Sequence, residues 1–188
     1  MTSPLDHGDA RPGPSAGVVA LAGNPRPGSR TLLVARTVAD QLARRLGAAA
    51  PPTALDVAEV AGELFAADAP EADRYRATLA AAAVAVVATP VYKASYTGLL
   101  KAFLDRVPTG GLRGVVAVPV VVSGTPAHSF VAEHLLAPLL VELGALVPVR
   151  PLAVTESQLD DLDAVVGAWA DEAAPVLARL VPGQGVAR

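Results

Sequence analysis

The sequence predicts an α/β protein: a five-stranded, doubly wound parallel sheet with helices on both faces, giving three α/β/α layers. Five short runs are rich in valine, alanine and leucine and are mostly apolar, as expected for strands buried on both faces. Amphipathic helical patterns separate these runs, which is typical of parallel βαβ units. The 188 residues suffice for one domain with a full core, and no internal repeat divides them.

The five predicted strands are short runs of mainly apolar residues. They cover residues 17–23, 52–60, 84–90, 114–124 and 145–154, of which 52–60 has the weakest pattern. Pro119 and Pro148 fall inside the last two of these strands. Because proline cannot donate a ladder hydrogen bond, we expect both strands to be irregular.

The five predicted helices carry apolar residues at spacings of three and four. They cover residues 29–47, 71–82, 96–107, 127–144 and 157–181. Gly47 is expected to end the first helix and Pro175 to bend the last one. Residues 16–182 are therefore predicted to form a single domain, flanked by tails at 1–15 and 183–188.

Composition excludes several classes of function. Hydrophobic residues make up 52% of the chain, too many for a disordered protein, and a net charge of −3 argues against a nucleic-acid-binding surface. The absence of cysteine excludes disulfides, thiolate catalysis and cysteine metal sites, and we expect no metal site. The first residues lack the pattern of a signal peptide and no apolar run is long enough for a bilayer, so a cytoplasmic location is expected.

The loop after the first strand, "LAGNPRPGSRT", is rich in hydrogen-bond donors. In an open α/β sheet, ligands bind beyond the carboxyl ends of the strands, and the following helix directs free N–H groups there. Asn24, Arg26, Ser29 and Thr31 would add an amide, a cation and two hydroxyls, a set that suits a terminal phosphate. The loop matches neither G-x-x-x-x-G-K-[ST] nor G-x-G-x-x-G. A purely structural turn capped by Ser29 is the alternative.

Two further loops are expected at the same edge. "ATPVYKASYTG" offers backbone N–H groups to a planar heterocycle, with Tyr92 and Tyr96 beside it. In "VVSGTPAH", a tight turn at Ser123, Gly124 and Thr125 would let the backbone approach a ligand. Together with a phosphate loop they indicate a mononucleotide with an aromatic ring, and flavin mononucleotide (FMN) fits best. Ordinary loop packing is the alternative for both.

The three segments "GNPRPGSRT", "ATPVYKASYTGLLKAFLDR" and "SGTPAH" resemble the NADPH-dependent FMN reductase family, which has a flavodoxin-like fold. Within the family, the resemblance is to reductases that serve alkanesulfonate and methanesulfonate monooxygenases, and it covers residues 17–155. It implies FMN and NADPH, or NADH, as cofactors, with hydride passing directly between them and no catalytic side chain. It also implies a homodimer or homotetramer that hands reduced flavin to a partner monooxygenase.

The resemblance also assigns roles to individual residues. It places the FMN phosphate on Arg26, Ser29 and Thr31, with Asn24 where the family usually has serine. The residues implied to border the isoalloxazine ring, mainly through backbone, are Pro90, Val91, Tyr92 and Lys93 on one side and Ser123, Gly124 and Thr125 on the other. Any of Arg26, Arg30 and Lys93 is a candidate for the extra phosphate of NADPH.

A π-bulge in the fourth helix is a further implication of the resemblance. It would fall at His134, near the flavin of a neighbouring subunit, with Tyr96 and His128 as other interface candidates. An ordinary surface histidine is the alternative. Lys101 and Asp105, at i and i+4, form either a surface ion pair or an interface contact.

Two other functions remain open on the sequence. One is a reductase of quinones, azo dyes or metal ions that retains its FMN, because the same three loops would serve it. The other is a flavodoxin-type electron carrier, although such carriers tend to be more acidic than this chain.

Overall fold

The computed structural model describes residues 15–181 and contains one sheet of five parallel strands in the order β2-β1-β3-β4-β5. The strands are β1 (Ser15–Ala22), β2 (Thr53–Asp56), β3 (Ala82–Pro90), β4 (Val116–Ser123) and β5 (Leu152–Thr155). This order confirms the predicted doubly wound topology. Ser15 begins β1, and the rest of the two predicted tails lies outside the described residues.

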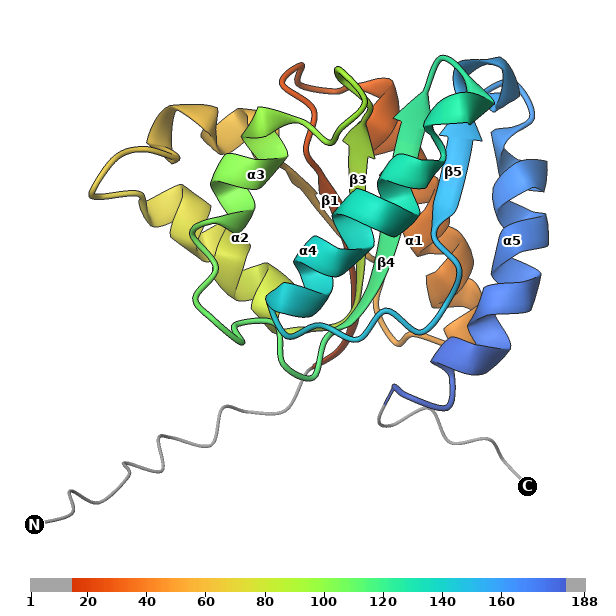
Figure 1. Cartoon of the computed structure of the whole chain (residues 1–188). Coiled ribbons are helices and arrows are strands. Elements are labelled where there is room, and N and C mark those ends of the chain that lie inside the picture. The colour runs from red at the N-terminus through yellow and green to blue at the C-terminus, as the bar shows by residue number, and fades with distance from the viewer. Residues whose placement is uncertain (1–14, 182–188) are drawn as a thin grey trace, which may run out of the picture.

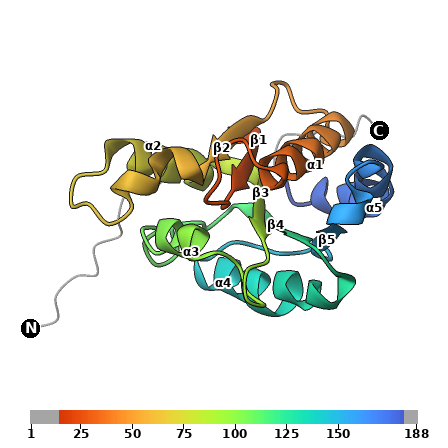
Figure 2. The same cartoon turned by 90° about the horizontal axis from the view of Figure 1, so that it is seen from above.

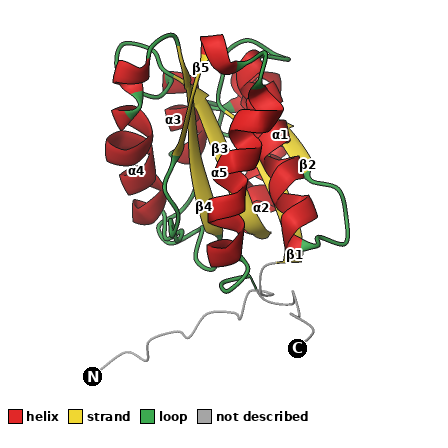
Figure 3. Cartoon of the chain, turned by 90° about the vertical axis from the view of Figure 1, so that its right-hand side faces the viewer, coloured by secondary structure: helices red, strands yellow, loops and turns green. Residues whose placement is uncertain are grey.

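Helices cover both faces of the sheet, as predicted (Figures 1 and 2). The helices α1 (Arg30–Leu46) and α5 (Leu162–Leu177) pack on one face. The other face carries α2 (Pro70–Ala80), α3 (Gly98–Leu104) and α4 (Ala137–Glu142). Figure 3 shows the resulting three layers from the side. No helix within residues 15–181 combines the length and apolar character needed to cross a bilayer.

Pro119 lies inside the buried central strand β4 without disrupting it. The N–H of Ala117 donates to the carbonyl of Leu146, 2.7 Å away, in the segment that leads to β5. Because backbone groups alternate in direction along a strand, the backbone of Pro119, two residues later, also faces the side of β5. Pairing of β4 with β5 begins only at Val120 and Leu152. Pro119 therefore falls in a gap of the ladder, where a missing N–H leaves no acceptor unpaired.

The predicted fifth strand, 145–154, is wrong in its first part. Only Leu146 pairs with β4, through an isolated bridge, and the regular strand spans Leu152–Thr155. Pro148 and Pro151 lie between these two points and cannot donate to a ladder, which explains the break. Ala145 and Val149 of this segment are buried without belonging to a strand, whereas Leu146 is exposed.

The predicted second strand, 52–60, is also too long. It ends at Asp56, where a carboxylate oxygen (Oδ1) accepts the N–H of Ala58 at 3.2 Å. This side chain caps a 3-10 helix, η1 (Val57–Glu63), in place of further strand. Val57 and Val60 are still buried in the core, which explains why this segment is apolar without being a strand.

The helix boundaries agree at the first helix and differ elsewhere. Ser29 caps α1, and Gly47 ends it with φ 65°, as predicted. The segment 127–144 is divided into a 3-10 turn (Pro126–His128), a π-helix (Val131–Leu136) that includes His134, and α4. His134, where the resemblance would place a π-bulge, lies within this π-helix.

The remaining predicted helices are shorter than expected. The segment 71–82 gives way at Ala82 to β3, and 96–107 is reduced to Gly98–Leu104 after the capping residue Thr97. The segment 157–181 opens with a 3-10 turn, Glu156–Gln158, before α5 begins at Leu162. Pro175 lies in the last turn of α5, where its missing N–H affects only the end of the helix.

Tyr75 links α2 to η1, and removing its hydroxyl should weaken the fold. The hydroxyl donates to Glu59 at 2.5 Å, and burial together with this bond raises the pKa of Tyr75 from its usual 10.0 to about 12. We expect Tyr75→Phe to lower the free energy of unfolding by about 1 kcal/mol. The stabilisation that the Tyr75 hydroxyl provides should be complete below pH 10, where Tyr75 is protonated in the unfolded chain as well. It should be lost as the pH rises to about 12, the pKa of Tyr75 in the folded protein. Urea unfolding at several pH values measures it, with Tyr92→Phe as a control on an exposed ring.

Candidate functional site

Three loops meet at the carboxyl edge of the sheet, at the top of Figure 1. They follow β1, β3 and β4. The hydroxyl of Thr97, in the second loop, donates to the carbonyl of Gly23 in the first at 2.5 Å, and also accepts the N–H of Leu100 at 3.0 Å. The N–H of Val91 donates to Val122 of β4 at 3.0 Å. These bonds hold the three strand ends in one fixed arrangement.

Asn24 shapes the first loop from within. Its side-chain oxygen accepts the N–H of Arg26 at 3.0 Å, and its amide nitrogen donates to the hydroxyl of Thr31 at 3.0 Å. Both Asn24 and Thr31 are buried. Two of the four predicted phosphate ligands therefore bind each other, and the Thr31 hydroxyl, an acceptor in this bond, retains its own proton for a further acceptor.

The start of α1 presents free donors to the same loop. Ser29 caps the helix by accepting the N–H of Leu32 at 3.3 Å. Within the described chain, the N–H groups of Ser29, Arg30 and Thr31 donate to no acceptor, and the first turn contains no acidic residue. The Arg26 side chain is exposed and forms no ion pair with residues 15–181. These donors make a site that favours an anion such as a phosphate.

The second loop contains a tight turn with an unusual backbone. Tyr92 and Ser95 exchange two hydrogen bonds, of 2.9 and 3.1 Å, across Lys93 and Ala94, whose φ angles are 51° and 60°. Positive φ at two successive non-glycine residues costs about 1–2 kcal/mol each. Such strain is characteristic of functional sites, and this turn leaves the ring of Tyr92, 45% exposed, and the side chain of Lys93 accessible at the edge.

The third loop leaves open space at its turn. The buried Ser123 hydroxyl donates to the carbonyl of Thr125 at 2.8 Å, and the Thr125 hydroxyl accepts the N–H of Ala127 at 3.4 Å. A methyl group placed on Gly124 would find no atom within 4 Å. The side chains of this loop are engaged with their own backbone, so the exposed main chain at Gly124 is what a ligand would meet.

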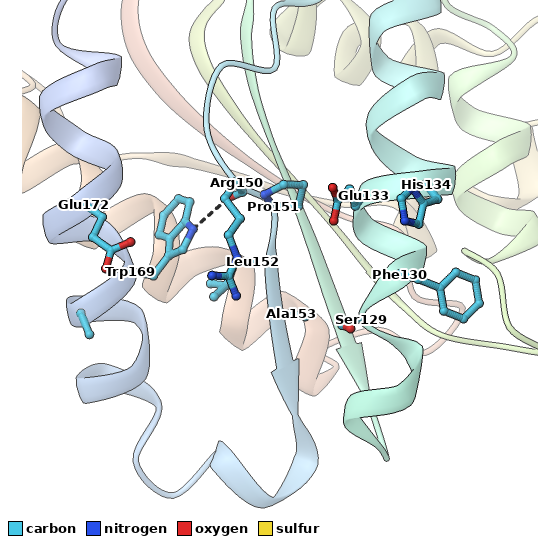
Figure 4. A pocket seen from close by; sticks show the side chains of 11 residues that line it. Ser129, Phe130, Glu133, His134, Arg150, Pro151, Leu152, Ala153, Trp169 and Glu172 are labelled. Atoms are coloured by element: carbon cyan, nitrogen blue, oxygen red, sulfur yellow. Dashed lines mark hydrogen bonds between the residues drawn. The ribbon is translucent and has the colours of Figure 1, made fainter.

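Of the predicted interface residues, Tyr96 follows the tight turn of the second loop, His128 ends the 3-10 turn after the third loop, and His134 lies in the π-helix. His134 lines a cavity of about 450 Å³ between the π-helix, the segment entering β5, and α5 (Figure 4). The cavity contains none of the predicted FMN residues. His128 makes an edge contact with the ring of Phe130, and Tyr96 packs on the core beneath α3. The position of His134 beside a neighbouring subunit's flavin stays a prediction.

The cavity runs along the outer edge of β5. The indole nitrogen of Trp169 donates to the carbonyl of Arg150 at 2.9 Å, as Figure 4 shows. Pro151 offers no N–H, and the N–H of Thr155 donates to the side chain of Gln158 at 2.9 Å. These features occupy or remove edge groups that another strand would use for pairing. The edge of β5 beside the cavity therefore offers fewer free backbone groups for pairing with another strand.

Two of the cations singled out in the sequence, Lys101 and Arg30, form ion pairs within residues 15–181. Lys101 and Asp105 form an exposed ion pair, 2.5 Å between Nζ and Oδ1. Arg30, a candidate for the extra phosphate of NADPH, pairs with Glu156 at 2.8 Å. Arg26 and Lys93 therefore remain the cations of the three loops that have no acidic partner within residues 15–181.

Two residues that organise the site were not predicted. Gly23 is buried where β1 approaches α3, and Asp56, at the end of β2, accepts the N–H of Gly28 at 2.9 Å. Gly23 directly follows an apolar strand, and this pattern could have identified it in the sequence as a residue of the site. Nothing local marks Asp56, because its partner in the loop is 28 residues away.

The sheet order β2-β1-β3-β4-β5, with helices on both faces, defines a flavodoxin-like α/β protein whose loops after β1 and β3 lie at the switch point of the sheet. The family model of NADPH-dependent FMN reductases matches residues 16–159. The chain belongs to this family.

Known relatives agree with this assignment. The chain is 37% identical to "FMN reductase (NADPH)" of Escherichia coli K12 over 94 residues, 50% of this chain and 49% of that protein. It is 33% identical to "NADH-dependent FMN reductase SfnE" of Pseudomonas putida over 151 residues, covering 78% and 79%. The crystal structure of an apo NADH:FMN oxidoreductase, EMOB, superposes with a TM-score of 0.69 at 28% identity, over 86% of this chain and 90% of that one. The match to the Escherichia coli enzyme thus spans about half of its length.

Proposed function

We propose that this protein is an NAD(P)H-dependent FMN reductase that binds FMN at the three-loop edge. The observation that carries the proposal is the set of three unpartnered N–H groups at the start of α1 beside the unpaired Arg26. Family membership and the relatives named for FMN reduction support it. When bound, FMN would supply the redox chemistry by accepting a hydride from NADPH or NADH.

In this proposal the protein binds and orients the two cofactors. The N–H groups of Ser29, Arg30 and Thr31, together with Arg26 and the two hydroxyls, hold the FMN phosphate. The backbone from Pro90 to Lys93 borders one side of the flavin ring, and that from Ser123 to Thr125 the other. The fixed 92–95 turn keeps these groups in place without reorganisation. No side chain needs to transfer a proton, because hydride passes between the two rings.

The finer parts of the proposal concern partners. We propose that FMN leaves after reduction and supplies a monooxygenase, in keeping with the resemblance to reductases of sulfonate systems. The chain would act in the cytoplasm as a homodimer or homotetramer. The cavity beside His134 is lined by none of the residues proposed to bind FMN.

Oxidation of NADPH, followed at 340 nm with and without added FMN, tests the proposal. A rate that rises and saturates with FMN supports a reductase that uses FMN as a substrate. Yellow protein that needs no added FMN and is accelerated by a quinone indicates the retained-flavin reductase. FMN binding without oxidation of NADPH or NADH indicates an electron carrier, and absence of FMN binding rejects the site.

A further inference from the structure

Asp56 is a buried carboxylate placed directly beside the phosphate loop. It is the last residue of β2, pairs in register with Ala22 of β1, and is 4% exposed. Its two oxygens accept backbone N–H groups, from Ala58 at 3.2 Å and from Gly28 at 2.9 Å. It forms no ion pair within residues 15–181. A buried charge with only backbone partners is costly, so the two bonds it makes have to be strong.

The bond to Gly28 acts at the point where the loop turns into α1. Gly28 has φ 63°, in the left-handed region, and a methyl group there would meet no atom within 4 Å. The position therefore needs glycine for its backbone angle and not for space. Gly28 comes immediately before Ser29, Arg30 and Thr31, whose free N–H groups form the anion site. Whatever holds Gly28 in this conformation also aims those three N–H groups.

We infer that Asp56 is a positioning residue for phosphate recognition: by accepting the Gly28 N–H, it holds the loop in the conformation that directs the three free N–H groups at the phosphate. The inference rests on the proposed function, since the anion is the phosphate of FMN. Asp56 is separated from that phosphate by the loop and acts through the backbone. It therefore affects ligands that carry the phosphate and not the flavin ring itself.

Asp56 also caps η1, so a purely structural role is the competing explanation. The two roles differ in their dependence on the ligand. Loss of the η1 cap would destabilise the fold and weaken all flavins alike. Loss of the Gly28 bond would weaken FMN selectively and leave riboflavin, which has the same ring and no phosphate, unchanged.

Binding of FMN and of riboflavin, each followed by quenching of flavin fluorescence, separates these roles. We expect Asp56→Ala to raise the Kd for FMN about ten-fold and to leave the Kd for riboflavin within about two-fold. Asp56→Asn can keep one acceptor oxygen and should give a smaller change in the same direction. Asp68→Ala, which removes an exposed carboxylate with no bond to the loop, is the matched control and should change neither Kd.

Each outcome has a distinct meaning. Equal weakening of both flavins, or tighter FMN binding after loss of the negative charge, overturns the inference. If Asp56→Ala does not fold, judged by circular dichroism of the flavin-free protein, the comparison is made with Asp56→Asn. If the wild-type protein binds FMN no more tightly than riboflavin, the proposed phosphate site fails first, before any statement about Asp56 is tested.

Discussion

Gly23→Ala is expected to lower the free energy of unfolding by about 2–3 kcal/mol, because the new methyl group has no room. It would overlap most closely with the Cβ of Leu100, a fully buried side chain of α3, and would lie 2.8 Å from its Cδ1 and 2.9 Å from its Cγ. Gly23 also donates its N–H to Ala88 at 2.8 Å and accepts the hydroxyl of Thr97. Relief of the overlap would pull β1 away from α3 and break the bond that joins the first two loops. Urea unfolding measures the loss of stability, and FMN titration measures the expected loss of binding.

Two controls make this prediction specific. Gly62→Ala adds the same methyl group at an exposed position with no atom within 4 Å, and should change stability by less than about 0.5 kcal/mol. In a double-mutant cycle, Gly23→Ala combined with Leu100→Gly should be less destabilising than the sum of the single changes, because glycine removes the Cβ of residue 100 together with the rest of the side chain. Additive effects, or a Gly23→Ala protein as stable as wild type, would show that β1 and α3 are not in the close contact described.

Arg26→Glu should raise the Kd for FMN about 100-fold, since it replaces a charge-assisted donor with a repelling carboxylate. Arg26 is exposed in the first loop and has no acidic partner within residues 15–181, so its charge is available to an incoming phosphate. The effect should shrink at high salt, because the interaction lies at the surface. FMN titrations at two ionic strengths, with riboflavin measured in parallel, provide the test.

Arg36→Glu is the matched control for Arg26→Glu. It makes the same change of charge on an exposed face of α1, beyond the first turn of the helix. It should leave FMN affinity nearly unchanged. If both variants weaken FMN equally, the effect comes from the overall charge of the protein and not from a contact in the first loop. If riboflavin weakens as much as FMN in Arg26→Glu, Arg26 does not bind the phosphate.

The site was predictable from the sequence to the extent that its features are local. Ser29 and Gly47 mark the ends of α1 because capping depends on residues within one turn. The three loops could be placed at one edge because parallel strands all end on the same side of a sheet. The role of Asn24 was not predictable, since whether its amide faces a ligand or Thr31 depends on how the loop closes.

By itself, the sequence determined the fold class, the strand and helix order, and the three loops that meet at the ligand edge, because hydrophobic periodicity and turn residues act over short distances. Tertiary structure alone decided where β2 and β5 begin and end. It also decided that residues 131–136 form a π-helix and that Asp56 and Thr97 hold the first loop through Gly28 and Gly23. The physical reason is that these features depend on partners 28 and 74 residues away and on small energy differences between backbone states, which packing resolves.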